Sequence, residues 1–150
     1  MLAGMWLVYS LGAAILWGIN YAASGRVMKQ GVSPAHLFLL DLAFAVVVIG
    51  GITTAAGKSR DLLAEVRALG PDWVWLAAAM ICSTAGGLAI FKAIDSKNAT
   101  LASLIEVSYP FFVALFAWLF FRETQFNWPT ALGGGLILAG VAVVYLGNPH

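Results

Sequence analysis

The chain has 150 residues, of which 61% are hydrophobic and 10% are charged, and its mean hydropathy is +0.89. Soluble domains carry roughly 25% charged residues, so this composition excludes an ordinary water-soluble domain and favours a protein embedded in lipid. The net charge is only +1, and without a basic patch or a glycine-rich phosphate loop the sequence indicates no nucleic-acid partner.

Five long runs with few or no charges predict five membrane-spanning helices. Each run is about 20 residues long, which is the length that an α-helix needs to cross a hydrocarbon core of ~30 Å. The predicted spans are residues 2–25, 34–56, 73–91, 98–121 and 128–147. We therefore expect an all-α, polytopic membrane protein that forms a single domain over residues 1–150.

The sequence marks where the first span ends and the second begins. Arg26 and Lys29 end the first uncharged run, and Ser33 followed by Pro34 is a typical N-cap and first helical position. Residues 22–24, Ala-Ala-Ser, resemble a signal-peptide cleavage site. The run before them is too long for a typical signal peptide, so we expect a membrane span.

A polar linker, residues 58–71, separates the second span from the third. Its apolar side chains recur at helical spacing and form one face of a short amphipathic helix: Leu62, Leu63, Val66 and Leu69. Such a helix is suited to lie at the membrane surface with its apolar face in lipid.

The fourth span contains Glu106, which lies eight residues past Asn98 and therefore about 12 Å deep. An ionised carboxylate at that depth costs on the order of 3 kcal/mol or more, so it should be protonated, paired or next to a wet cavity. Pro110 follows one turn later and removes a backbone donor, which frees the carbonyl of Glu106. A carboxylate beside an interrupted helix is typical of a transport site.

Polar residues on two further spans share the depth of Glu106. Asp41 lies about 10 Å from the same face of the membrane and Asn20 about 9 Å from it. We predict a substrate-binding or proton-binding layer that also includes two aromatic residues at depth, so that its members are Glu106, Asp41, Asn20, Tyr109 and Trp17. The alternative is that the two acids are protonated and only join helices, through hydrogen bonds that average below ~1 kcal/mol in membranes.

The fifth span carries small residues at intervals of four, namely Ala131, Gly135 and Ala139. Small residues at this spacing let two helices approach closely. The stripe predicts either a dimer contact or packing within the chain, and the sequence supports both interpretations equally.

The residue types that carry catalysis or bind metals are scarce. The two histidines are isolated, Cys82 is the one cysteine, and no spacing of metal ligands occurs. We therefore expect no metal site, no cofactor and no enzymatic activity. An enzyme acting on lipid would need a catalytic group at the membrane interface, and none stands out.

Three stretches resemble the EamA domains of the drug/metabolite transporter superfamily. Residues 17–21, Trp-Gly-Ile-Asn-Tyr, are similar to that family's first-helix motif, and residues 99–119 with Pro110 resemble its fourth helix. Glu123 and the glycine-rich residues 133–141 resemble its acidic turn and fifth helix, although Arg122 stands where the family usually has a small residue. Members usually carry two such domains. The resemblance therefore implies half of an inverted-repeat transporter, which acts as a homodimer or with a half-size partner chain.

The favoured hypothesis is a small-molecule transporter of the inner or plasma membrane that works as a dimer. Its solute is a metabolite or an amino-acid-like or cationic compound, and Glu106 is a plausible site of proton coupling. The resemblance favours an exporter of metabolites or amino acids over a drug pump. The alternative from another class is a membrane subunit that does not transport but scaffolds or regulates a partner protein.

Positive charge gives no orientation in the membrane. With five spans the connections alternate between the two sides, and the positive-inside rule works through a difference in lysine and arginine between them. The two sides carry four basic residues each: Lys58, Arg60, Arg67 and Arg122 on the N-terminal side, and Arg26, Lys29, Lys92 and Lys97 on the other. We predict insertion in both directions and an antiparallel homodimer. A parallel dimer or a partner of fixed orientation is the alternative.

Overall fold

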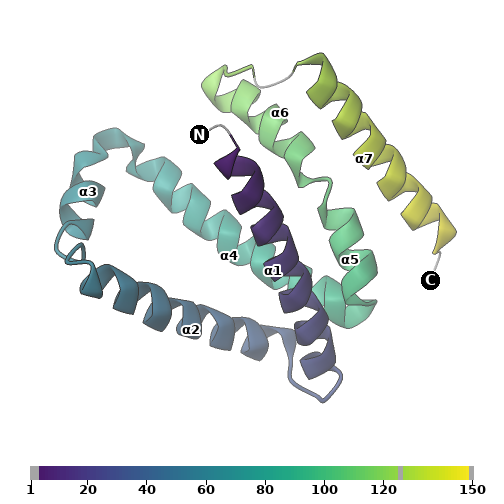
Figure 1. The fold of residues 1–150 in the computed structure, drawn as a ribbon, viewed down its shortest axis with the longest axis horizontal. Coiled ribbons are helices and arrows are strands. Elements are labelled where there is room, and N and C mark those ends of the chain that lie inside the picture. Colours follow the sequence, from purple (N-terminus) through teal and green to yellow (C-terminus); the bar gives the residue numbers. More distant parts are fainter. Residues whose placement is uncertain (1–3, 125–126, 149–150) are drawn as a thin grey trace.

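The computed structural model describes residues 4–124 and 127–148, and these residues form helices and short connections without a β-strand. Five spans are long and apolar enough to cross a membrane. They are formed by α1 (Met5–Met28), α2 (Pro34–Ala55), α4 (Trp73–Ser96), the pair α5 (Ala99–Glu106) and α6 (Tyr109–Phe121), and α7 (Trp128–Gly147) (Figure 1). The predicted all-α, five-span fold is confirmed. Residues 2 and 3 of the first predicted span lie outside the described residues.

Side-chain caps begin three of these helices. The Ser33 hydroxyl accepts a hydrogen bond from the His36 N–H at 3.3 Å, and the helix continues from Pro34. The Asn98 side chain accepts from the Leu101 N–H at 2.9 Å, and Asn127 caps α7 in the same way. Each cap satisfies a backbone donor that the first turn of a helix leaves without a partner.

The end of α4 differs from the sequence-based prediction. The predicted third span stops at residue 91, whereas α4 continues to Ser96 and includes Lys92. The connection to α5 is therefore only Lys97 and Asn98. A charge does not end a helix by itself, because the exposed lysine side chain can extend to the membrane surface while its backbone stays helical.

The linker between α2 and α4 forms the short helix α3 (Leu62–Ala68) and a single 3₁₀ turn, η1 (Gly70–Asp72). The apolar side chains of the predicted amphipathic face are exposed: Leu62, Leu63, Val66 and Leu69. Their location at the membrane surface stays a prediction.

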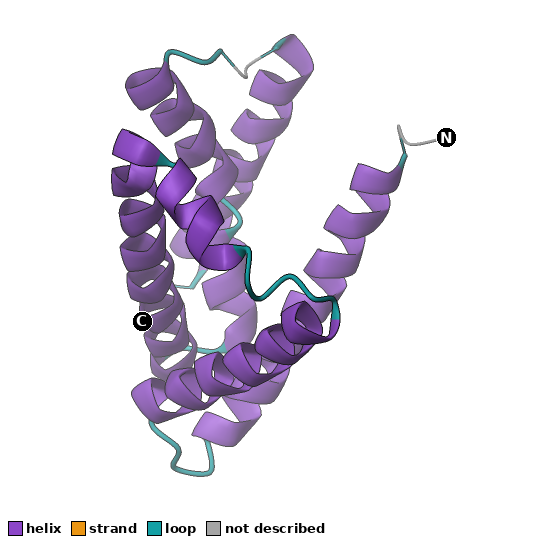
Figure 2. Cartoon of the chain, turned by 90° about the vertical axis from the view of Figure 1, so that its left-hand side faces the viewer, coloured by secondary structure: helices purple, strands orange, loops and turns teal. Residues whose placement is uncertain are grey.

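The core of the molecule lies at one end of the helices. Its centre is formed by Tyr21, Met28, Ile94 and Ala102, which come from α1, α4 and α5. Figure 1 shows these helices meeting where α1 ends and α5 begins. The side chains from Met5 to Ile19 are exposed, apart from the half-buried Gly12, and Figure 2 shows this half of α1 leaning away from the other helices.

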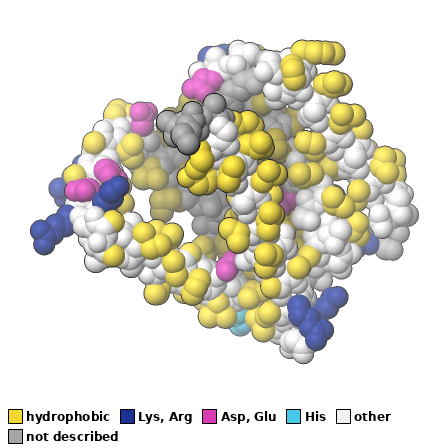
Figure 3. Space-filling view, viewed as in Figure 1, with side chains coloured by type: hydrophobic (Ala, Val, Ile, Leu, Met, Phe, Trp, Pro, Cys, Tyr) yellow, Lys and Arg dark blue, Asp and Glu magenta, His cyan; other side chains and the backbone are white. Residues whose placement is uncertain are grey.

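Apolar side chains cover most of the outer surface. No residue of α2 or α7 is fully buried, and Figure 3 shows hydrophobic side chains spread across the visible face with lysine and arginine at its edges. Water-soluble monomers rarely expose continuous apolar areas of this extent. The surface is suited to contact lipid or another membrane-embedded chain.

Helices α2 and α4 contact each other at Gly87. The ring of Phe38 lies against this glycine, and a Cβ atom added at residue 87 would lie 2.6 Å from Cε2 of Phe38. The same ring contacts Phe91, with ring centroids 5.4 Å apart. Glycine is therefore required at position 87 for this helix pair to approach so closely.

Tryptophans gather at the end of the molecule that holds the chain's N-terminus. Figure 1 shows that α1, α4 and α7 begin and α6 ends at this side. Five exposed tryptophans lie near these helix ends: Trp6, Trp73, Trp75, Trp118 and Trp128. A belt of tryptophan is typical of a membrane–water interface, so the arrangement is consistent with five spans crossing the bilayer together.

Candidate functional site

The fourth span is interrupted directly after Glu106. Two helices form the span predicted over residues 98–121: α5 ends at Glu106 and α6 begins at Tyr109. The Ser108 N–H donates to the Ile105 carbonyl at 3.2 Å, which tightens the chain between the two helices. Pro110 has no N–H, so the Glu106 carbonyl lacks the donor that a continuous helix would supply. The break therefore lies beside the carboxylate.

Glu106 is joined to α1 by a hydrogen bond from Tyr21. The Tyr21 hydroxyl donates to Oε1 of Glu106 at 3.0 Å. Tyr21 is buried in the core and its ring also contacts Trp17, with ring centroids 5.5 Å apart. A half-buried carboxylate, a phenol and an indole thus form a continuous group across two helices.

The sequence analysis did not select Tyr21 as a site residue. It selected the preceding Asn20, because residues 20 and 21 lie at nearly the same depth in the membrane and depth was the criterion used. Depth does not show which side of α1 faces α5, and consecutive helical residues point in different directions. The spacing of four residues between Trp17 and Tyr21 places both on one face, and this signal could have identified Tyr21.

Asn20 lies beside this pair in the sequence but makes a different contribution. Its side-chain oxygen Oδ1 is buried and accepts no hydrogen bond within the described residues. A buried acceptor without a donor costs about 1–3 kcal/mol. Asn20 therefore offers an acceptor to any group that brings an N–H or O–H donor to this part of the membrane.

The remaining predicted site residues are less closely associated. Asp41 is half-buried on α2, and within the described residues no hydrogen bond joins it to Glu106 or Asn20. Helix α2 packs chiefly on α4 and diverges from the end of α5 (Figure 1). Tyr109 is exposed at the start of α6, close enough to Tyr21 to interact with it electrostatically. A role for Asp41, Tyr109 and Trp17 in binding stays a prediction.

The small residues predicted to form a helix contact lie on the outer face of α7. Ala131, Gly135 and Ala139 are exposed, and an added Cβ atom at Gly135 would meet no atom within 4 Å. The half-buried residues of α7 lie on another face: Gly133, Gly134, Ile137, Val141 and Val144. The stripe therefore does not pack against the rest of the described chain, and its role as a dimer contact stays a prediction.

Among the described residues, no three His, Cys, Asp or Glu side chains come together in a way that could hold a metal ion.

Comparison with known proteins gives one match. The model of the EamA-like transporter family matches residues 4–146, which include Trp17, Asn20, Tyr21 and Glu106. Neither the curated proteins nor the solved structures contain a match. The matched region covers all five spans, as the resemblance of the sequence motifs predicted. This chain, an integral membrane protein, belongs to the EamA-like transporter family.

Proposed function

We propose that the protein transports a small solute with a protonated amine, either an amino-acid-like metabolite or an organic cation, across the inner or plasma membrane. The hydrogen bond between Tyr21 and Glu106, beside the interruption of the fourth span, is the observation that carries the proposal. In this hypothesis the carboxylate binds solute and proton alternately, and the protein works as a dimer.

The position of Glu106 favours a role in binding over a purely structural one. It lies about 12 Å from the start of its span, where an acid is costly to maintain. Hydrogen bonds between membrane helices average only ~0.6 kcal/mol, so a structural bond is a weak reason for such a residue. Either a proton or a cationic solute can neutralise the Glu106 carboxylate, but both cannot bind the same oxygen atoms at once. The two therefore compete for this site, and such competition allows a proton to be exchanged for the solute.

The acceptors near the site favour a solute that donates hydrogen bonds. Glu106 is acceptor-only when ionised, and Asn20 adds a buried oxygen without a donor. An ammonium group has three donors and a positive charge, so it suits an ionised carboxylate, and its donors also suit an amide oxygen such as that of Asn20. A phosphate or carboxylate solute would instead meet oxygens of like polarity, which disfavours anions.

A dimer is supported by the domain count and by the exposed stripe on α7. One domain of five spans has its two ends on opposite sides of the membrane, so a second copy inserted in the reverse direction supplies the inverted repeat used for alternating access. The equal numbers of basic residues on the two sides favour this antiparallel arrangement over a parallel dimer. Ala131, Gly135 and Ala139 offer a close contact to the second helix.

Transport in liposomes tests the proposal. Amino acids and organic cations are first screened for their ability to raise the unfolding temperature of the purified chain, and uptake of the best ligand is then driven by a pH gradient. Glu106→Gln should fold but lose this uptake, Asp41→Asn should lose less, and Glu65→Gln in the exposed helix α3 serves as the control.

Full pH-driven uptake by Glu106→Gln would refute proton coupling at this residue. If both the Glu106→Gln and the Asp41→Asn variant keep full function in cells, the alternative is the better explanation: a membrane subunit that does not transport.

A further inference from the structure

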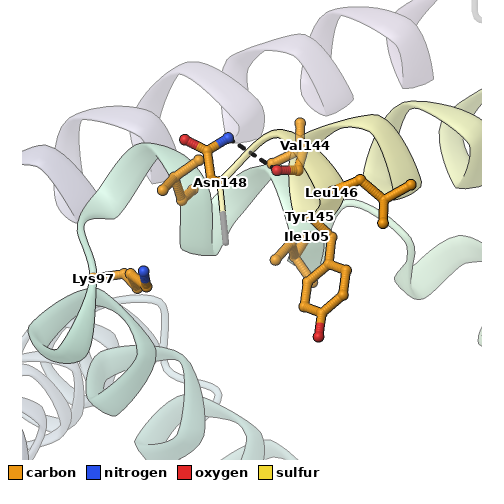
Figure 4. A pocket seen from close by; sticks show the side chains of 7 residues that line it. Lys97, Ile105, Val144, Tyr145, Leu146 and Asn148 are labelled. Carbon is orange, nitrogen blue, oxygen red and sulfur yellow. Dashed lines mark hydrogen bonds between the residues drawn. The ribbon is translucent and has the colours of Figure 1, made fainter. Parts of the chain in front are cut away.

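Two cavities lie away from Glu106, at the end of the molecule opposite the tryptophans. One has a volume of about 320 Å³ and lies where the end of α1 meets the connection between α4 and α5. The other has a volume of about 310 Å³ and lies between α5 and the end of α7 (Figure 4). Lys97 lines both of them, so the two cavities adjoin at this residue.

The first cavity is basic. Its charged lining consists of Arg26, Lys29 and Lys97 against the single carboxylate of Asp95. Within the described residues none of the three cations makes an ion pair with a carboxylate. An excess of two positive charges therefore faces the cavity without compensation.

Backbone donors at the start of α5 add to this positive character. Asn98 and Thr100 line the same cavity, and the Asn98 side chain already satisfies the Leu101 N–H. The other N–H groups of a first helical turn have no partner in the helix, and phosphate groups bind well at such positions. The chemistry of the first cavity thus fits a phosphate.

The second cavity is apolar over most of its length. It extends along α5 from Lys97 past Leu101 to Ile105, with Val144 and Leu146 of α7 on the opposite side. Figure 4 shows Ile105 of α5 beside Tyr145 of α7, with Lys97 on the connection that precedes α5. The seven helical residues from Ala99 to Ile105 correspond to about 10 Å of helix, about two thirds of the depth of half a hydrocarbon core of ~30 Å.

We propose that the two cavities together form a binding site for an anionic phospholipid. Arg26, Lys29 and Lys97 hold its phosphate, and one acyl chain lies between α5 and α7 beside Leu101 and Ile105. A soluble phosphate would use only the basic cavity and would leave the apolar one unexplained. A zwitterionic lipid would place its cationic headgroup in a cavity that already has an excess of two positive charges. The site does not depend on the transport hypothesis.

A lipid in this position would also connect parts of the fold that touch little. Helix α7 packs chiefly on α5, and no residue of α7 is fully buried. The bound headgroup would contact α1 and the start of α5 while its acyl chain contacts α7. We therefore expect the lipid to stabilise the folded chain, which gives a direct measurement of binding.

The test is the unfolding temperature of the purified chain in a neutral detergent. It is titrated with palmitoyl-oleoyl phosphatidylglycerol, with the matching phosphatidylcholine, and with soluble glycerol 3-phosphate. Phosphatidylglycerol should raise the unfolding temperature to a plateau, and the other two compounds should not. Equal stabilisation by phosphatidylcholine would overturn the anionic selectivity, and equal stabilisation by glycerol 3-phosphate would assign the basic cavity to a soluble phosphate.

Substitutions locate the site. Lys97→Gln should weaken phosphatidylglycerol binding by about fivefold, which is the factor expected for one cation near an anionic headgroup. The double variant Arg26→Gln/Lys29→Gln should weaken it more than the matched variant Lys58→Gln/Arg60→Gln, which removes the same charge from the opposite side. Equal losses from the two double variants would mean non-specific attraction and overturn the proposal. Val144→Phe fills the apolar cavity, and unchanged binding in that variant would overturn the placement of the acyl chain.

Discussion

The hydroxyl of Tyr21 lies 3.0 Å from a carboxylate oxygen of Glu106, and this hydrogen bond joins α1 to the last residue of α5. This hydrogen bond lies where the backbone of the fourth span is interrupted. The Glu106 side chain therefore holds the interrupted segment against α1. The packing of α1 and the conformation of the break are therefore coupled through one pair of atoms.

Removing this bond should destabilise the protein measurably. In a double-mutant cycle with Tyr21→Phe and Glu106→Leu, we expect a coupling free energy of about 0.6–1.7 kcal/mol, as for other hydrogen bonds between membrane helices. The measurement is equilibrium unfolding in mixed detergent micelles. Tyr109→Phe is the control, because its ring is exposed. A coupling energy near zero would mean that the bond does not hold the break in place.

Alanine at two adjacent glycines of α4 should have opposite effects. At Gly86 an added Cβ atom meets nothing within 4 Å, so Gly86→Ala should stabilise the helix by about 0.5–1 kcal/mol. At Gly87 the Cβ atom meets the ring of Phe38, so Gly87→Ala should cost about 1–3 kcal/mol. Unfolding curves of both variants give the comparison. Phe38→Leu should partly restore the Gly87→Ala protein, and a lack of rescue would argue that the strain lies elsewhere.

Arg122 ends α6 in the left-handed conformation, with a φ of 59°. This conformation costs an ordinary residue about 1–2 kcal/mol relative to glycine, while the guanidinium 5.8 Å from the Trp118 ring centre returns about 0.5–1 kcal/mol. We expect Arg122→Gly to be at least as stable as the native chain and Arg122→Ala to be less stable than both. Thermal unfolding checks the order, and equal stability of the two variants would contradict the strain.

Cross-linking checks the proposed dimer. With the exposed Cys82 replaced by serine, single cysteines at Gly135 or Ala139 should form disulfide-linked dimers in membranes under mild oxidation. A cysteine at Ile137, on the half-buried face of α7, should link poorly. The same efficiency at all three positions would indicate random collisions. If no position gives dimers, the outer face of α7 is not the dimer contact.

Orientation is checked with reporters fused to the C-terminus, one active only inside the cell and one only outside. Equal numbers of basic residues on the two sides predict comparable signals from both reporters. Adding a lysine at either end should then shift the ratio strongly. One active reporter, unaffected by the added lysine, would mean a fixed topology and exclude the antiparallel homodimer.

The sequence predicted the spans well because run length and charge are strong signals in a membrane protein. It also placed the break near Pro110, since proline acts on the backbone within one turn. It did not predict that Tyr21 contacts Glu106, because depth along a helix carries no information about rotation around its axis. The grouping of Asp41 with Glu106 rests on equal depth alone, and α2 packs chiefly on α4, so this grouping stays a prediction.

The one-sided core has a mechanical consequence. The residues from Met5 to Ile19 extend from the packed end of α1 as a rigid rod about 21 Å long. A rotation of about 10° around Tyr21 displaces the free tip of this rod by about 4 Å, comparable to the width of a small amine, while the atoms of the core move only slightly. In such a rotation the packed region around Tyr21 would be the pivot. Because Glu106 accepts a hydrogen bond from Tyr21, a change at this carboxylate would act at the pivot and would be largest at the other end of α1.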